Sequence, residues 1–222
     1  MTNEHLAQRN ILLAGATGLV GGQMLQALLN KPDVGQVHVL LRRPLAVQHP
    51  KLRAHVVDFG ALPTLPPVDE VYLALATTIR VAGSQDAFRA VDLTANLAVA
   101  EAGFTAGARR LAVVSAVGAN ARSSTFYLRI KGELEDALQR LDLTALVVAR
   151  PSLLLGDRDA LKQPSRLGEK IATPVMKLLA PLLPQHYRPI EGRDVARALV
   201  NALPKARGTT ILYHKDLMAM AD

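Results

Sequence analysis

Short runs of apolar residues alternate with helical patterns along most of the chain. Most of the seven runs are continuous rather than alternating, which is typical of strands buried on both faces of a parallel sheet. Between the runs, helical periodicity begins near Leu19, covers about 86–103 and 125–141, and returns after Gly192. This order predicts an α/β fold, a doubly wound parallel sheet. Its predicted strands are residues 10–16, 37–41, 54–59, 70–76, 111–117, 144–150 and 209–214.

The alternation of apolar runs and helical patterns is interrupted once, between about residues 156 and 190, by prolines and a mixed helical pattern. We predict one domain over 1–222, in which 156–190 forms a small helical cover on the substrate side of the sheet. The apolar stretch "IATPVMKLLAPLLP" lies in this segment and is too short and too rich in proline to span a bilayer. A membrane-spanning segment is therefore not expected.

Composition narrows the class of protein. Half of the residues are hydrophobic and 20% are charged, so a large core is expected. The absence of cysteine excludes disulfides and thiolate metal sites, and the polar N-terminal "MTNEHLAQRN" lacks a signal-peptide pattern, so a cytoplasmic protein is predicted. The six histidines show no metal-ligand spacing, and no metal site is predicted.

The charge balance is basic, with a net charge of +7 and a pI of about 10.0. The cations are scattered, however, and aromatic residues are 4% with no tryptophan, so the stacking platforms of nucleic-acid binders are scarce. No nucleic-acid partner is expected. A phosphate-rich small molecule fits this charge at least as well.

A glycine-rich turn, "AGATGLVGG", follows the first predicted strand directly. Glycines in such a turn allow a tight bend and the close approach of a pyrophosphate, and the amides that open the next helix point at phosphate oxygens. The alternative is a glycine-rich turn without a ligand. We predict that the turn binds a dinucleotide cofactor through Gly15, Thr17, Gly18, Leu19 and Val20.

The end of the second strand distinguishes two cofactors. A free ribose 2′-hydroxyl favours a carboxylate at this position, but the strand ends in "VLLRRP", with Arg42 and Arg43. Guanidinium groups suit a 2′-phosphate, so NADP is preferred over NAD. The alternative is a pair of solvated arginines before a turn.

Further cofactor contacts are expected at the carboxyl ends of other strands. Asp58 and Phe59, after the third strand, are predicted to meet the adenine amino group and ring. Pro151, after the sixth strand, is predicted to bend the chain past the nicotinamide. The middle of the cofactor is predicted to lie against Ala76, Thr77 and Thr78.

The reacting end of the cofactor is predicted from three residues. Ser115 ends the fifth strand in "VVSAVGAN", and Tyr127 and Lys131 lie one helical turn apart in "FYLRIKGELE". A phenol is a weak base at neutral pH, and an adjacent ammonium favours its ionised form. The tyrosine can then exchange a proton with a substrate oxygen that the serine hydroxyl orients. The alternative is an ordinary helix in which the tyrosine packs and the lysine is solvated.

Several motifs together resemble the short-chain dehydrogenase/reductase superfamily: "GATGLVGG", "SAVGAN", "YLRIK" and "RPSLLLGDR". The chain is most similar to an atypical, extended-like NAD(P)H-binding group of the Tat-interacting-protein type, which shares "ATTIRVAGSQDAFRAVD" and "KGELE". The resemblance implies a Rossmann fold, an NADP-type cofactor, and Ser115, Tyr127 and Lys131 as the active-site residues. The superfamily often has a relay asparagine on the helix after the fourth strand. Asp92 matches that position here, and Asn96 is expected to be an ordinary helix residue.

Two functions follow from these residues. The first is an NADP-dependent oxidoreductase, or an epimerase- or dehydratase-like enzyme using the cofactor transiently, that acts on a small carbonyl or alcohol substrate. The second is a non-catalytic NADP(H)-binding redox sensor or scaffold with a protein partner. A monomer and a homodimer that pairs helices 86–103 and 125–141 are both compatible with the sequence.

Overall fold

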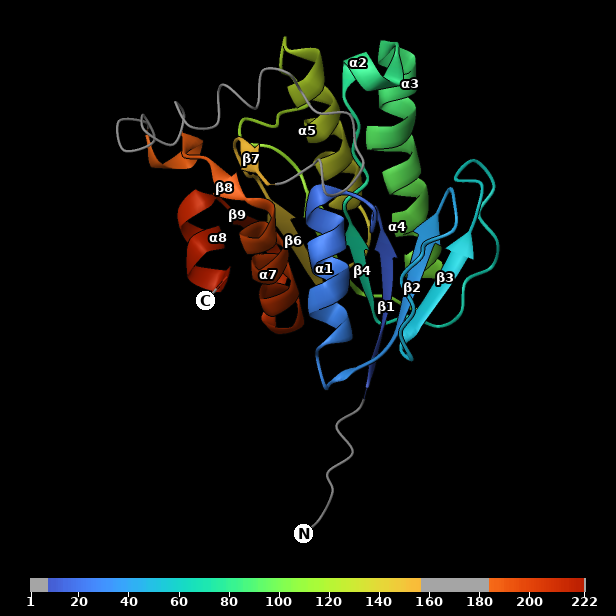
Figure 1. Cartoon of the computed structure of the whole chain (residues 1–222). Helices are drawn as coiled ribbons and strands as arrows, with labels where there is room; N and C mark the ends of the chain where they lie inside the picture. Colours follow the sequence, from blue (N-terminus) through green and yellow to red (C-terminus); the bar gives the residue numbers. More distant parts are fainter. Residues whose placement is uncertain (1–7, 157–183, 222) are drawn as a thin grey trace.

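A seven-stranded parallel sheet forms the centre of the computed structural model, which describes residues 8–156 and 184–221. The strand order is β3-β2-β1-β4-β5-β6-β9, and helices cover both faces (Figure 1). The order reverses between β1 and β4, which is where doubly wound sheets bind their ligands, at the carboxyl ends of the strands. The predicted fold class is confirmed.

All seven predicted strands are present. The predicted runs extend up to three residues past the observed carboxyl ends, because the apolar pattern continues into the segments that leave the sheet. The observed strands are β1 (Arg9–Ala14), β2 (Val34–Leu41), β3 (Leu52–Val56), β4 (Glu70–Leu73), β5 (Arg110–Val114), β6 (Ala145–Ala149) and β9 (Gly208–Leu212).

Two apolar layers flank the sheet. On one face, α1 (Leu19–Leu29) and α7 (Gly192–Ala202) pack against residues such as Ile11 and Leu13 of β1. On the other face, α4 (Asn96–Thr105) and α5 (Phe126–Leu138) pack against Leu12 and Ala14. Because both faces of β1 are covered, its four residues from Ile11 to Ala14 are fully buried. This explains the continuous apolar run.

The helix predicted over 86–103 is divided in the structure. It comprises α3 (Gln85–Arg89), a π-helix η1 (Ala90–Ala95) and α4, with a short α2 (Ile79–Ala82) before them. π-Helical turns are rare and occur mostly at functional sites. Here the wide turn carries a fully buried carboxylate, that of Asp92, which apolar periodicity could not reveal.

The C-terminal part adds elements that the sequence pattern did not predict. A two-stranded parallel sheet pairs β7 (Leu154–Leu155) with β8 (Ile190–Glu191), and α8 (His214–Ala221) follows β9. A 3₁₀ turn, η3 (Gln185–Tyr187), precedes β8, and another, η4 (Leu203–Lys205), follows α7. Most of the predicted cover, 156–190, lies outside the described residues.

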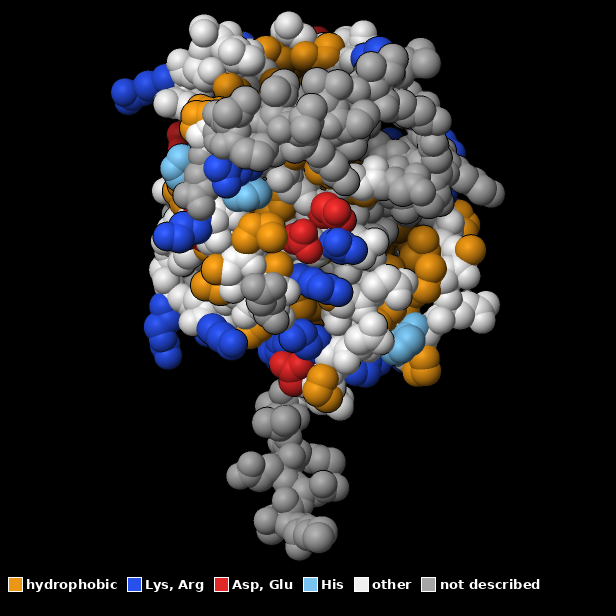
Figure 2. Space-filling view, turned by 60° about the vertical axis from the view of Figure 1, so that its left-hand side comes forward, with side chains coloured by type: hydrophobic (Ala, Val, Ile, Leu, Met, Phe, Trp, Pro, Cys, Tyr) orange, Lys and Arg blue, Asp and Glu red, His pale blue; other side chains and the backbone are white. Residues whose placement is uncertain are grey.

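The surface over α7 and α8 carries Lys and Arg side chains spread among acidic ones (Figure 2). Arg193, for example, pairs with Glu191 at 3.1 Å and lies 3.6 Å from Asp194. On this face the basic side chains are thus interspersed with acidic ones and do not form one continuous basic patch. Among the described residues, no helix combines the length and apolar character that a membrane span requires.

A histidine pair joins β2 to the edge strand β3. His38 Nδ1 lies 3.0 Å from His55 Nε2, and the two rings stack with centroids 5.3 Å apart. Burial, with the charges of His55 and Arg53, lowers the pKa of His38. The unfolded chain therefore binds more protons than the folded one below about pH 6.5, and acid destabilises the fold.

We expect the free energy of unfolding to fall between about pH 7.5 and about pH 5.5, and to fall less in His38→Gln. Urea unfolding at both pH values measures the difference. His214, whose pKa is also lowered by burial, leaves part of the dependence in the variant. An unchanged difference in His38→Gln would exclude the histidine pair as a source of acid sensitivity.

Candidate active site

The glycine turn after β1 forms a close-packed loop at the start of α1. Gly15 has a φ of +92°, and a Cβ at this position would lie 2.4 Å from the Ala74 backbone. A Cβ on Gly21 would lie 2.1 Å from the Gly15 carbonyl oxygen, so neither position accepts a side chain. Gly18 N donates to Gly15 O at 2.9 Å and leads into α1 without a side-chain cap. The loop backbone is therefore open to an anionic ligand, as a pyrophosphate site requires.

Leu19 and Val20 are the first residues of α1, and Thr17 is exposed just before them. Val20 is buried in the core, whereas Leu19 is partly buried and lies beside Gly156 and Gly192. A Cβ on Gly156 would lie 2.4 Å from Leu19 Cδ1, and one on Gly192 2.9 Å from Leu19 Cγ. Gly156 and Gly192 thus pack directly onto the start of α1.

The ends of β2 and β3 carry the residues predicted at the adenosine end. Arg42 and Arg43 follow β2 directly and are both exposed. Asp58 accepts a hydrogen bond from Gly60 N at 2.9 Å, which shapes the turn after β3. Phe59 is half-buried against the core on the α4 side, so packing already uses part of its ring.

The segment after β4 is held by polar contacts. Thr77 N donates to Asp92 Oδ2 at 2.8 Å, and Thr78 Oγ1 accepts from Val81 N at 3.2 Å to cap α2. Ala76 is exposed beside them. Asn96, which was expected to be an ordinary helix residue, is buried, and its side chain donates to Leu75 O at 3.0 Å. That expectation was wrong, because the amide holds the segment that follows β4.

Lys131 forms a buried ion pair with Asp92. Lys131 Nζ lies 2.7 Å from Asp92 Oδ1, and the two side chains are 3% and 0% exposed. Because Asp92 also receives Thr77 N, one carboxylate joins α5 to the segment after β4. The alternative of a solvated lysine is therefore excluded.

Tyr127 lies one turn before Lys131, at the start of α5. Its ring packs edge-on against Phe88, with centroids 5.9 Å apart, and the residue is 38% exposed. Positions four apart share a face of a helix, so Tyr127 and Lys131 lie along one side of α5. A partly exposed phenol beside a buried charged network can meet a ligand from solvent.

Ser115 is buried at the carboxyl end of β5 and donates its hydroxyl to Glu135 Oε1. Glu135 continues the row of Tyr127 and Lys131 by one more turn of α5. Arg150 contacts both carboxylate oxygens, with Nε 3.1 Å from Oε1 and Nη2 2.5 Å from Oε2. This hydrogen bonding raises the pKa of Arg150. Ser115 is therefore part of a charged network.

Pro151 follows Arg150 and is buried, and its carbonyl accepts from Val117 N at 2.9 Å. The chain after β6 is thereby joined to the chain after β5. The predicted site residues Ser115, Tyr127, Lys131 and Pro151 therefore lie around the carboxyl ends of β4, β5 and β6.

Glu135 and Arg150 were not among the site residues predicted from the sequence. A signal was available, because Glu135 is a carboxylate four residues after Lys131, on the apolar face of an amphipathic helix. Arg150 directly follows a strand whose residues are all buried. A charge at either position needs a partner, and each is the partner of the other.

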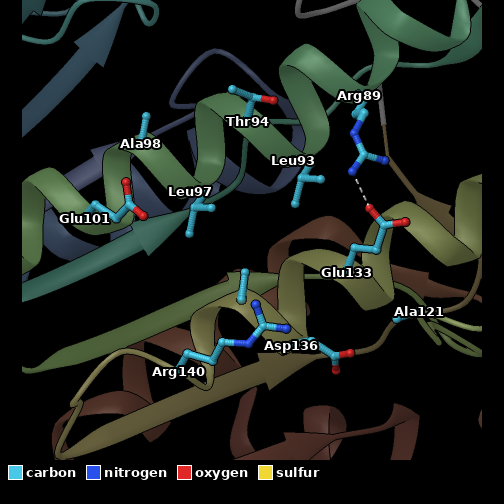
Figure 3. Close-up of a pocket in the computed structure, with 11 residues that line it drawn as sticks. Arg89, Leu93, Thr94, Leu97, Ala98, Glu101, Ala121, Glu133, Asp136 and Arg140 are labelled. Carbon is cyan, nitrogen blue, oxygen red and sulfur yellow. Dashed lines mark ion pairs between the residues drawn. The ribbon is translucent and has the colours of Figure 1, made fainter.

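The opposite face of α5 borders a separate groove. Figure 3 shows residues from α3, η1 and α4 facing residues of α5 across it, with Arg89 paired to Glu133 at 2.7 Å. The floor is apolar at Leu93 and Leu97, and Arg140 adds a further charge. The two faces of α5 thus differ: one carries the buried charged row and the other a half-exposed groove.

Solved structures share this fold at low sequence identity. MoeE5 in complex with UDP-glucose and NAD matches with a TM-score of 0.67 and 17% identity, over 96% of this chain and 80% of that chain. The ADP-L-glycero-D-manno-heptose-6-epimerase of Helicobacter pylori matches with a TM-score of 0.66 and 16% identity, over 99% and 83%. At this identity the likeness concerns the fold.

Curated relatives are considerably more similar in sequence. Protein FMP52-1, mitochondrial, from Scheffersomyces stipitis is 33% identical over 85% of both chains. Protein fmp52, mitochondrial, from Aspergillus clavatus is 33% identical over 89% of this chain and 88% of its own.

Both relatives are named as mitochondrial proteins, which contradicts the predicted cytoplasmic localisation. That prediction was wrong because cysteine content reports on redox conditions, whereas import into an organelle depends on targeting segments.

No family model matches the chain. The relatives nevertheless align with most of its length, and the solved structures match its overall fold. The chain belongs to the Fmp52 family, with the fold of the short-chain dehydrogenase/reductase superfamily.

Proposed function

We propose that this protein is an NADP-dependent oxidoreductase that acts on a small carbonyl or alcohol substrate, with Ser115, Tyr127 and Lys131 at its active site. The observation that supports it most is the row of Tyr127, Lys131 and Glu135 on one face of α5, joined to the carboxyl ends of β4 and β5 by hydrogen-bonded contacts. A helix carrying no chemistry has little reason to bury two charged residues at successive turns.

The side chains would divide the work in carbonyl reduction. Tyr127 would donate its proton to the substrate oxygen, and Ser115 would contact the same oxygen. Lys131 would hold the cofactor ribose and supply positive charge near the phenol, with Asp92 fixing its position. NADPH, when bound, would supply the hydride.

The loop after β1 fits a dinucleotide. Gly15 and Gly21 leave no room for side chains, and the N-cap residue Gly18 provides no side-chain cap for α1, which supports binding of phosphate oxygens by the backbone amides there. Two of the solved relatives in fold, MoeE5 complexes, contain NAD. On these grounds we assign a nicotinamide dinucleotide to the loop. We choose NADP rather than NAD because Arg42 and Arg43 suit a 2′-phosphate.

Changing Arg42 and Arg43 to Ala together is expected to remove most of an NADPH preference of at least about tenfold over NADH, because both guanidinium groups are exposed at the end of β2. Fluorescence titration of both cofactors with both proteins gives the ratio. Arg53→Ala, an exposed change on neighbouring β3, is the control and should keep the preference. Equal affinities in the unaltered protein would reject the NADP assignment.

A redox sensor that binds NADP(H) without turnover is the second candidate. It is favoured by one observation: Lys131 and Ser115 are already engaged by Asp92 and Glu135 within the protein. An ammonium neutralised in this way tunes a neighbouring phenol less strongly than a free one.

A panel of aldehydes and ketones tests the two functions. Carbonyl-dependent oxidation of NADPH, followed by its absorbance, would support the oxidoreductase. NADPH binding without consumption across the whole panel would reject the oxidoreductase in favour of the sensor.

A further inference from the structure

The strongest unassigned feature is the contact between Ser115 and Glu135. Both side chains are buried, at 4% and 2% exposure, and the Ser115 hydroxyl donates to Glu135 Oε1. Glu135 lies two turns beyond Tyr127 on the same face of α5. The serine predicted to meet the substrate is thus already bonded to a carboxylate behind it.

Arg150 fixes the direction of that hydrogen bond. Its guanidinium donates to both oxygens of Glu135, and its Nη1 donates to the Tyr213 hydroxyl at 3.0 Å. A carboxylate held by an arginine in this way accepts hydrogen bonds and has none to donate. The proton between Ser115 and Glu135 therefore comes from the serine.

This direction limits what Ser115 can offer a ligand. A serine hydroxyl has one proton and two acceptor lone pairs. With the proton directed at Glu135, only the lone pairs of the Ser115 oxygen face the ligand. An alcohol can donate a hydrogen bond to these lone pairs. A carbonyl oxygen has no proton to donate, so it forms no hydrogen bond with Ser115 and both oxygens are left without this partner.

We propose that Glu135, held by Arg150, is a positioning residue that makes Ser115 a hydrogen-bond acceptor, so that the site binds the alcohol form of its substrate more tightly than the carbonyl form. The proposal rests on the proposed function, because it assumes that Ser115 faces the substrate. It adds a selectivity that the identities of Ser115, Tyr127 and Lys131 do not imply.

Glu135→Gln tests the direction directly. Arg150 Nη2 makes its shorter contact with the Oε2 position and Nε its longer one with Oε1. The glutamine oxygen is therefore expected at the Oε2 position, with the amide N–H₂ toward Ser115 and the longer contact with Nε given up. The amide then donates to the serine, whose proton turns toward the ligand. The variant should gain affinity for carbonyl probes as it loses affinity for alcohols.

The experiment uses two matched probe pairs, acetone with 2-propanol and cyclohexanone with cyclohexanol. Dissociation constants are measured from the fluorescence of bound NADPH in a Tyr127→Phe background, where turnover does not interfere. We expect alcohols to bind at least about tenfold tighter than the matched ketones. In Glu135→Gln, the ratio of the ketone dissociation constant to the alcohol dissociation constant should fall to one or below.

Two further variants separate positioning from a structural role. Ser115→Ala leaves the pair of Glu135 with Arg150 intact and should also remove the preference, even if Glu135→Gln folds poorly. Glu133→Gln, on the groove face of α5, is the matched control and should keep it. A structural role for Glu135 would weaken both probes together and leave the ratio unchanged.

Ketones that bind as tightly as alcohols, alcohols that fail to bind, or a ratio that survives both Glu135→Gln and Ser115→Ala would overturn the proposal. Its failure is distinguishable from failure of the proposed function. A preference for alcohols without NADPH consumption by the unaltered protein rejects only the proposed reaction. Consumption with equal affinities rejects only the role of Glu135.

Discussion

Replacing Tyr127 by phenylalanine is expected to lower the rate of carbonyl-dependent NADPH oxidation by about 10³-fold, within the range that a positioned proton donor contributes. The change removes one oxygen and keeps the ring that packs edge-on against Phe88. The rate follows from NADPH absorbance under saturating cofactor, with the best carbonyl of the panel.

NADPH affinity provides the control for this variant. The glycine loop, Arg42 and Arg43 are untouched, so the dissociation constant for NADPH should change by less than about threefold. A variant that keeps more than a tenth of the rate would show that another group supplies the proton. Loss of NADPH binding together with the rate would instead place the Tyr127 hydroxyl in cofactor binding.

Asp92→Asn is expected to lower the free energy of unfolding by about 3–5 kcal/mol, the cost of leaving a buried charge without its partner. Asparagine keeps the shape of the side chain and an oxygen for Thr77 N, but it removes the negative charge 2.7 Å from Lys131 Nζ. Both side chains are almost completely buried, so water cannot replace the lost partner. Urea unfolding of the cofactor-free protein measures the difference.

Glu133→Gln is the matched comparison, since it also neutralises a carboxylate of an ion pair that α5 forms, in this case with α3 rather than η1. Its partner Arg89 is 47% exposed and Glu133 is 27% exposed, so the loss should stay below about 1 kcal/mol. Equal losses in the two variants would mean that Lys131 finds another partner when Asp92 is neutral. The proposed role of Asp92 in holding the lysine would then be wrong.

The buried pair also bears on the relay position. The superfamily often carries an asparagine there, and this chain carries Asp92 in a π-helical turn. The neighbouring Asn96 donates to Leu75 O, so the two polar side chains together anchor the segment after β4. Asp92 therefore holds both the Lys131 side chain and the backbone of Thr77, which is predicted to contact the cofactor.

Selectivity for the alcohol form would affect the direction in which the enzyme catalyses its reaction. A site that holds the alcohol more tightly than the carbonyl releases the product of reduction slowly. The network of Ser115, Glu135 and Arg150 would thus favour an enzyme that captures alcohols at low concentration.

The fold class, the seven strands and the glycine loop could all be predicted from the amino-acid sequence. These follow from local patterns: continuous apolar runs require cover on both faces, and closely spaced glycines mark a turn that side chains would block. It also indicated Tyr127 and Lys131, because their spacing of four is a property of any helix.

The contacts of the charged side chains, in contrast, depend on the folded arrangement of the chain. Lys131 pairs with Asp92, and Glu135 joins Ser115 to Arg150, across elements that are 15 to 39 residues apart in the chain. The division of the helix after β4 by η1 also became visible only there. Apolar periodicity records which face is buried, but the partner of a buried charge depends on which strands and helices become neighbours, and that is a property of the assembled sheet.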